Sequence, residues 1–150
     1  MRFNRRGGQG GWLVIVIAAI LALVVVAFVR SRNAEKHVTL VGFDPIIKVE
    51  DALAAGKQAQ KPTLLYFTAS WCPPCKEMKK NVLPQDAVAT TVRDNFVGVY
   101  IDIDARPSDA NQFGISGVPT FIIMNKDGQE IARMTGGMRE REFLEFLTAR

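Results

Sequence analysis

The stretch Thr63–Lys76, TLLYFTASWCPPCK, carries most of the information about the fold of this 150-residue chain. Its first six residues form a short apolar run rich in β-forming side chains, which predicts a strand covered on both faces. A helix is expected from Cys72 to about Val82, bent or ended near Pro84. A buried strand followed closely by a helix places Cys72 and Cys75 at the start of that helix.

Cys72 and Cys75 are the only cysteines, and three roles compete for them. A structural disulfide across two intervening residues closes too small a loop to contribute much chain-entropy stabilisation. A zinc site needs two more ligands of the Cys or His type, and His37 is the only histidine. A redox pair fits best, because Cys-x-x-Cys after a buried strand and at the opening of a helix is typical of thiol–disulfide exchange.

The spacing of the pair suits this chemistry. At the helix start, the sulfur of Cys72 faces unpaired amides and the positive end of the helix dipole, which lowers its pKa. Cys75 lies one turn further on, within reach of a mixed disulfide formed at Cys72. Cys72 is therefore the expected nucleophile and Cys75 the resolving thiol. Pro73 and Pro74 stiffen the turn but remove two amide donors, so Cys72 is expected to be modestly activated, which suits a reductant better than a strong oxidant.

The rest of the folding region is expected to alternate helices and strands. No repeat or low-complexity block interrupts it. The strongest local signal is Asp127-Gly128, a hairpin turn dipeptide between two apolar runs. The expected elements are a helix over Asp44–Ala55, a strand over Phe96–Asp104, a short helix over Ser108–Phe113, strands over Thr120–Met124 and Glu130–Met134, and a helix over Arg139–Thr148. This order predicts an α/β sheet with a crossover half and an antiparallel half.

A second feature, the segment Gly114–Thr120, places Pro119 directly before a predicted strand. An interior strand normally excludes proline, and a cis Val118–Pro119 bond would resolve the conflict, although cis is the minority state of X-Pro bonds. The glycines do not make a phosphate loop, because the Lys-Ser/Thr ending and the following helix are missing.

Over about residues 38–150 the chain resembles the thioredoxin family. The resemblance rests on four segments in the family's order and near its spacing: Tyr66–Lys76, Ile101–Asp104, Phe113–Thr120, and Gly136 ahead of a final amphipathic helix. Within the family, the chain is most similar to anchored cell-envelope members, such as the C-terminal domain of DsbD-type thiol:disulfide interchange proteins and the thioredoxins of cytochrome maturation. The resemblance implies an α/β, thioredoxin-like fold, a central mixed β-sheet flanked by helices.

The resemblance also implies roles for particular residues. Cys72 attacks and Cys75 resolves, Trp71 flanks the exposed sulfur, and a cis Pro119 lies beside the pair. Backbone groups at Val118 then bind an extended substrate segment. No cofactor beyond the redox-active disulfide is implied, and the partners are protein thiols and disulfides together with an electron donor of the membrane or envelope.

Two positions depart from the family pattern. Many thioredoxins carry a buried Asp six residues before the first cysteine and a Lys on the neighbouring strand, which assist proton transfer at the second cysteine. The corresponding residues here are Tyr66 and Tyr100. Either a water or a tyrosine hydroxyl serves Cys75, or the enzyme is slower or tuned differently. A packing role for both tyrosines is equally open.

The N-terminal part of the chain has a different character. Residues 12–29 contain no charged, amide or hydroxyl side chain. At about 1.5 Å per residue such a helix approaches the thickness of the hydrocarbon core of a bilayer, so a transmembrane anchor is expected in preference to a cleaved signal peptide. It lies between a basic tail over residues 1–11 and a stem over residues 30–37, and residues 38–150 form a single thioredoxin-like domain.

The charge of the chain follows this division. Three of the four net positive charges, Arg2, Arg5 and Arg6, precede the apolar run, and residues from 30 onward carry only +1 (16 basic minus 15 acidic). The charge therefore gives no support for a nucleic-acid surface. Lys and Arg residues are about equally frequent on the two sides of the apolar run, so charge alone does not set its orientation. Because long C-terminal domains translocate with little regard for charge, we expect the C-terminal domain to lie outside the cytoplasmic membrane.

Three functions remain open at this point. The favoured one is a monomeric, membrane-anchored thiol–disulfide oxidoreductase that reduces proteins of the cell envelope, facing the periplasm or exterior. The second is a disulfide oxidase on the same fold. The third is a non-enzymatic module whose thiol pair binds Cu(I).

Overall fold

The computed structural model describes residues 14–25, 40–45 and 47–148. The chain divides into two units, residues 1–38 and 39–150, which are considered separately. In the first unit, residues 14–25 form an exposed helix. The ends of the predicted anchor (12, 13 and 26–29), the basic tail and the stem lie outside the described residues. Among the residues that are described, no helix is both long and apolar enough to cross a membrane.

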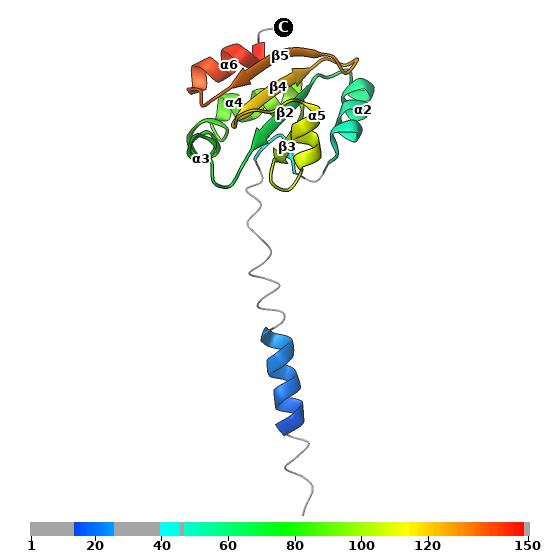
Figure 1. The fold of residues 1–150 in the computed structure, drawn as a ribbon, viewed down its shortest axis with the longest axis vertical. Helices are drawn as coiled ribbons and strands as arrows, with labels where there is room; N and C mark the ends of the chain where they lie inside the picture. The colour runs from blue at the N-terminus through cyan, green and yellow to red at the C-terminus, as the bar shows by residue number, and fades with distance from the viewer. Residues whose placement is uncertain (1–13, 26–39, 46, 149–150) are drawn as a thin grey trace, which may run out of the picture. The chain divides into compact units, whose positions relative to one another are not determined.

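The second unit is built on a five-stranded mixed sheet with the order β1-β3-β2-β4-β5 (Figure 1). β3 pairs in parallel with β1 and β2, while β4 runs antiparallel to β2 and β5. The strand bounds are β1 Phe43–Asp44, β2 Thr63–Thr68, β3 Val97–Asp102, β4 Thr120–Met124 and β5 Glu130–Thr135. The predicted mixed sheet, with a crossover half and an antiparallel hairpin, is confirmed.

Helices cover both faces of the sheet, and β2 shows the division. Its side chains alternate between two buried clusters, with Leu64 and Tyr66 in one and Leu65 and Phe67 in the other. The first face is covered by η1, α4 and α6, and the second by α2 and the segment after α5. The helix bounds are α2 Val49–Ala59, α3 Pro73–Glu77, η1 Met78–Val82 (a π-helix), α4 Asp86–Asn95, α5 Pro107–Gln112 and α6 Glu140–Thr148.

The predicted helix start at Asp44 is wrong. Phe43–Asp44 is strand β1, paired with Gly98 and Val99, and α2 begins at Val49. Asp44 instead accepts the backbone N–H of Ile47 at 3.1 Å, closing a turn before the helix. The pairing depends on Gly98, because a Cβ there would lie 2.0 Å from the carbonyl oxygen of Gly42. This close approach between strands is a tertiary feature that the local sequence does not reveal.

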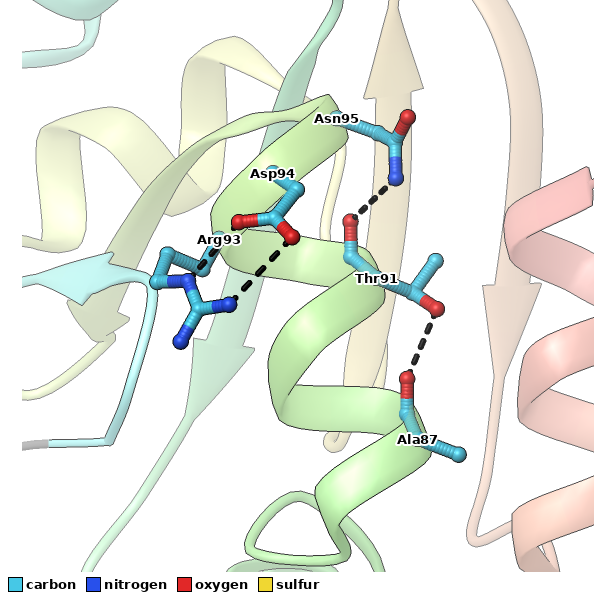
Figure 2. Close-up of polar contacts among 5 residues, drawn as sticks. All are labelled: Ala87, Thr91, Arg93, Asp94 and Asn95. Carbon is cyan, nitrogen blue, oxygen red and sulfur yellow. Dashed lines mark hydrogen bonds and ion pairs between the residues drawn. The ribbon is translucent and has the colours of Figure 1, made fainter.

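Helix α4 was not predicted. Val88, Ala89 and Val92 are its buried residues, and the other positions are mostly polar with modest helix propensity. On its exposed side, the Thr91 hydroxyl donates to the Ala87 carbonyl at 2.7 Å and the Asn95 amide donates to the Thr91 carbonyl at 2.9 Å (Figure 2). Packing of its few apolar residues on the sheet therefore stabilises this helix more than its propensity does.

Candidate active site

The cysteine pair lies where β2 leads into α3. Cys72 is the N-cap of α3, and its Sγ accepts the backbone N–H of Cys75 at 3.2 Å. Pro73 and Pro74 occupy the first two helical positions and carry no N–H. The Cys75 amide is therefore the first donor that the helix can offer, and it is directed at the Cys72 sulfur, where it would also favour a thiolate.

Cys72 and Cys75 form a disulfide, with their Cα atoms 5.3 Å apart. Both are buried: Cys72 is 2% exposed and Cys75 is fully covered. Ala69 is buried with them, and Ile103 and Val118 pack against this small cluster. Of the two residues, only Cys72 keeps an exposed fraction, which is consistent with the predicted order of attack and resolution.

The loop before β4 approaches the pair from the other side. The Val118–Pro119 bond is cis, as the resemblance implied. Cys72 Sγ lies 3.4 Å from the Val118 carbonyl oxygen. A disulfide sulfur has no proton, so this is a close contact in the oxidised form and becomes a hydrogen bond when Cys72 is a thiol. The backbone of Val118 is thus held against the reacting sulfur.

Three hydrogen bonds hold this loop in place. The Thr120 hydroxyl donates to the Gly117 carbonyl at 2.8 Å and lies 3.0 Å from the Thr135 hydroxyl. The backbone N–H of Gly136 donates to the Pro119 carbonyl at 2.8 Å. Thr120, Thr135 and Gly136 therefore tie the loop to the β4–β5 hairpin. Of these, the sequence indicated Thr120 and Gly136, through the family segments, but not Thr135.

Trp71 is the exposed aromatic beside the pair, with 61% of its surface accessible. Its indole N–H donates to Asp104 Oδ2 at 2.9 Å. Asp104 follows β3, so this hydrogen bond joins the loop before the cysteines to the end of the neighbouring strand. The sequence identified both residues within family segments but did not predict their contact.

Tyr66 lies beneath the pair and is completely buried. Its hydroxyl donates to the Cys75 carbonyl at 3.3 Å, and its ring stacks on Phe121 with 4.4 Å between centroids. Burial raises its pKa well above the usual range, because the phenolate would lose hydration there. Tyr66 therefore stays protonated at neutral pH and acts as a hydrogen-bond donor rather than a base.

Tyr100 is the register partner of Tyr66 on β3, and the two rings meet edge to face with 5.6 Å between centroids. Its hydroxyl accepts a hydrogen bond at 3.3 Å from the ammonium group of Lys79, which lies 5.6 Å from the centre of the Tyr100 ring. The sequence motifs did not identify Lys79 as part of the site. The available signal was its position four residues after Cys75, which places the two residues on the same side of a helix.

The arrangement supports dithiol–disulfide exchange. A sulfur near the surface faces an amide donor, a second sulfur lies within bonding distance, and a backbone carbonyl is positioned beside the first. Within residues 14–25, 40–45 and 47–148, no group of three or more His, Cys, Asp or Glu side chains is placed to hold a metal ion.

Comparison with known proteins gives the same chemistry. Residues 49–150 match the family model of the thioredoxin-like domain. The chain is 36% identical over 104 residues to thioredoxin of Mycobacterium tuberculosis, covering 68% of this chain and 86% of that protein. It is 32% identical over 130 residues to the thiol:disulfide interchange protein DsbD of Vibrio vulnificus, covering 81% of this chain.

The DsbD relatives are much longer proteins, and the chain spans only 19–25% of their length. Among solved structures, the chain is similar to the C-terminal domain of Neisseria meningitidis DsbD in its reduced form, with a TM-score of 0.58 and 27% identity. That match covers 70% of this chain and 96% of the domain. The similarity to DsbD is thus a similarity to one of its domains.

Proposed function

Since the chain belongs to the thioredoxin-like family of thiol–disulfide oxidoreductases, we propose that it reduces disulfide bonds of proteins in the cell envelope. The observation that carries the proposal is the placement of Cys72 between the Cys75 amide and the Val118 carbonyl. Cys72 attacks a substrate disulfide, and Cys75 then releases the substrate. A substrate strand beside Val118 and cis Pro119, next to the exposed Trp71, accounts for protein substrates.

The direction of electron flow rests on the prolines. Pro73 and Pro74 leave the Cys75 amide as the first helical N–H, so fewer donors favour the Cys72 thiolate than in a helix with free amides at these positions. A less stabilised thiolate makes the disulfide form relatively favourable, which is the behaviour of a reductant. A reduction potential near about −270 mV supports this direction, and one near about −120 mV supports the oxidase.

We also propose that the apolar run of residues 12–29 anchors the protein in the cytoplasmic membrane, with the thioredoxin-like domain on the outer side. The run has no charged side chain, and Arg2, Arg5 and Arg6 precede it without an acidic residue. Protease treatment of intact cells tests the arrangement. We expect a protease that reaches the outer face of the cytoplasmic membrane to digest the C-terminal domain. A protease that does not reach this face should leave the domain intact.

Substitution of each cysteine tests the reaction. In insulin reduction by the full chain in detergent, we expect Cys72→Ser to abolish turnover, because the attacking sulfur is lost. Cys75→Ser should form mixed disulfides with substrates and fail to release them. Turnover of Cys72→Ser at the wild-type rate would exclude the proposed reaction.

A further inference from the structure

Cys75 and Lys79 share one side of the helix that follows the redox pair. Residues four apart on a helix lie about one turn from each other on the same side. Cys75 is fully buried against the sheet, and Lys79 is partly buried. Lys79 thus lies one helical turn beyond Cys75, in η1.

The sheet offers a matching pair of groups. Tyr66 and Tyr100 are register partners on adjacent strands and point to the same face. The Tyr66 hydroxyl contacts the backbone of Cys75, and the Tyr100 hydroxyl contacts the ammonium of Lys79, each at 3.3 Å. Two residues one helical turn apart thus contact two neighbouring residues of the sheet, and the packed tyrosine pair links the ammonium group of Lys79 to the backbone of Cys75.

The charges around Cys75 differ from those expected for the family. The position of the usual buried acid is Tyr66, whose phenol is neutral. On β3, Asp102 follows Tyr100 on the same face, and its Oδ1 accepts the backbone N–H of Asp104. On the same helix Lys76 and Glu77 are exposed, and the backbone N–H of Met138 donates to Met78 Sδ. Lys79 is the cation that contacts Tyr100, the partner of Tyr66 on the neighbouring strand.

We propose that Lys79 is a positioning residue that stabilises the Cys75 thiolate and so speeds the resolving step, with Tyr100 holding its ammonium group in place. In that step the Cys75 thiol loses its proton to water, and the thiolate attacks Cys72 Sγ of the mixed disulfide. The Cys72–Cys75 bond forms as the bond from Cys72 to the substrate sulfur breaks, and the substrate leaves as a thiolate. A buried thiol resists this ionisation, and a nearby positive charge offsets part of the cost.

The inference rests on the proposed function. A reaction with oxidised glutathione distinguishes a failure of the inference from a failure of the proposed function. The reduced full chain in detergent reacts with oxidised glutathione, is quenched with acid at set times, and is analysed by mass spectrometry from pH 6 to pH 9. Attack by Cys72 produces a chain carrying one glutathione, and resolution by Cys75 removes it. The rates of the two steps are therefore measured separately in one experiment.

In Lys79→Met we expect the resolving rate at pH 7 to fall about three- to tenfold and its pH midpoint to rise by about 0.5–1 unit. The rate of attack should change much less. Lys79→Arg, which keeps the charge, should restore most of the rate, and Tyr100→Phe should give an intermediate loss. Lys80→Met is the matched control, because Lys80 is adjacent and exposed.

An unchanged pH midpoint in Lys79→Met, or an equal shift in Lys80→Met, would overturn the role of Lys79 and leave the proposed function intact. If the wild-type chain neither acquires glutathione nor forms the Cys72–Cys75 disulfide, the proposed function itself fails. A loss in Lys79→Met that Lys79→Arg does not restore would mean that packing, rather than charge, is responsible.

Discussion

The indole N–H of Trp71 donates to Asp104 across 33 positions of sequence and holds the exposed aromatic ring beside the cysteine pair. The hydrogen bond joins the loop before α3 to the end of β3, so the orientation of Trp71 depends on the pairing of two neighbouring strands. Trp71 is 61% exposed while Cys72 is 2% exposed, so under the proposed function a protein substrate contacts this ring as it approaches Cys72.

Asp104→Ala should release the Trp71 ring without disturbing the sulfur chemistry. We expect KM for insulin to rise about two- to fivefold, matching the loss of one partly solvated hydrogen bond, with kcat little changed. The matched control is Asp127→Ala in the exposed β4–β5 turn, which should leave both constants as they are. A fall in kcat at constant KM would show that Asp104 acts on the cysteines rather than on Trp71.

Thr120→Val should destabilise the loop that carries cis Pro119. The substitution keeps the shape of the side chain but removes its hydrogen bond to the Gly117 carbonyl, which should lower the free energy of unfolding by about 1–2 kcal/mol. Thr135→Val should cost less, because the bond from Thr120 to Gly117 remains. Urea denaturation of both variants and of the double variant measures their coupling, and fully additive effects would contradict a shared network.

Tyr66 should make the folded protein sensitive to strongly alkaline pH. Burial raises its pKa in the folded state, so above about pH 10 the unfolded chain releases this proton while the folded chain retains it. The free energy of unfolding should then fall as pH rises, by up to about 1.4 kcal/mol per pH unit for one proton. Denaturation curves between pH 8 and pH 11 check this.

The matched variant for this measurement is Tyr66→Phe. It should lose about 1 kcal/mol at neutral pH with the hydrogen bond to Cys75, yet show a shallower decline above pH 10. A decline as steep as that of the wild-type protein would assign the alkaline sensitivity to other groups.

Gly98→Ala should disrupt the edge of the sheet. The added methyl would lie 2.0 Å from the Gly42 carbonyl oxygen, so β1 must separate from β3, at a cost of about 2–3 kcal/mol in the free energy of unfolding. Gly137→Ala is the comparison, since its methyl would meet only Pro74 Cβ, at an ordinary 3.5 Å. Chemical denaturation should show a small change there, and equal losses in the two variants would contradict the close approach at Gly98.

Much of the fold was predictable because its signals are local. The apolar run Thr63–Thr68, the Asp127-Gly128 turn and the final amphipathic helix each depend on residues close in sequence. The order of a buried strand and a following helix likewise placed Cys72 at a helix start, where it caps α3. The cis Val118–Pro119 bond also has a local signal, because a proline directly before β4 conflicts with the geometry of a strand.

The sequence by itself therefore determined the α/β class, the strand–helix setting of the cysteines and the pairing of β4 with β5. Tertiary structure alone decided that Phe43–Asp44 is a strand, that α4 forms on three buried residues, and that Trp71 meets Asp104. It also decided that the Tyr66 hydroxyl meets the Cys75 carbonyl and that the Lys79 ammonium group meets Tyr100. Such contacts depend on which strands are neighbours and in what register, and a register is set by the whole packed sheet rather than by any one segment.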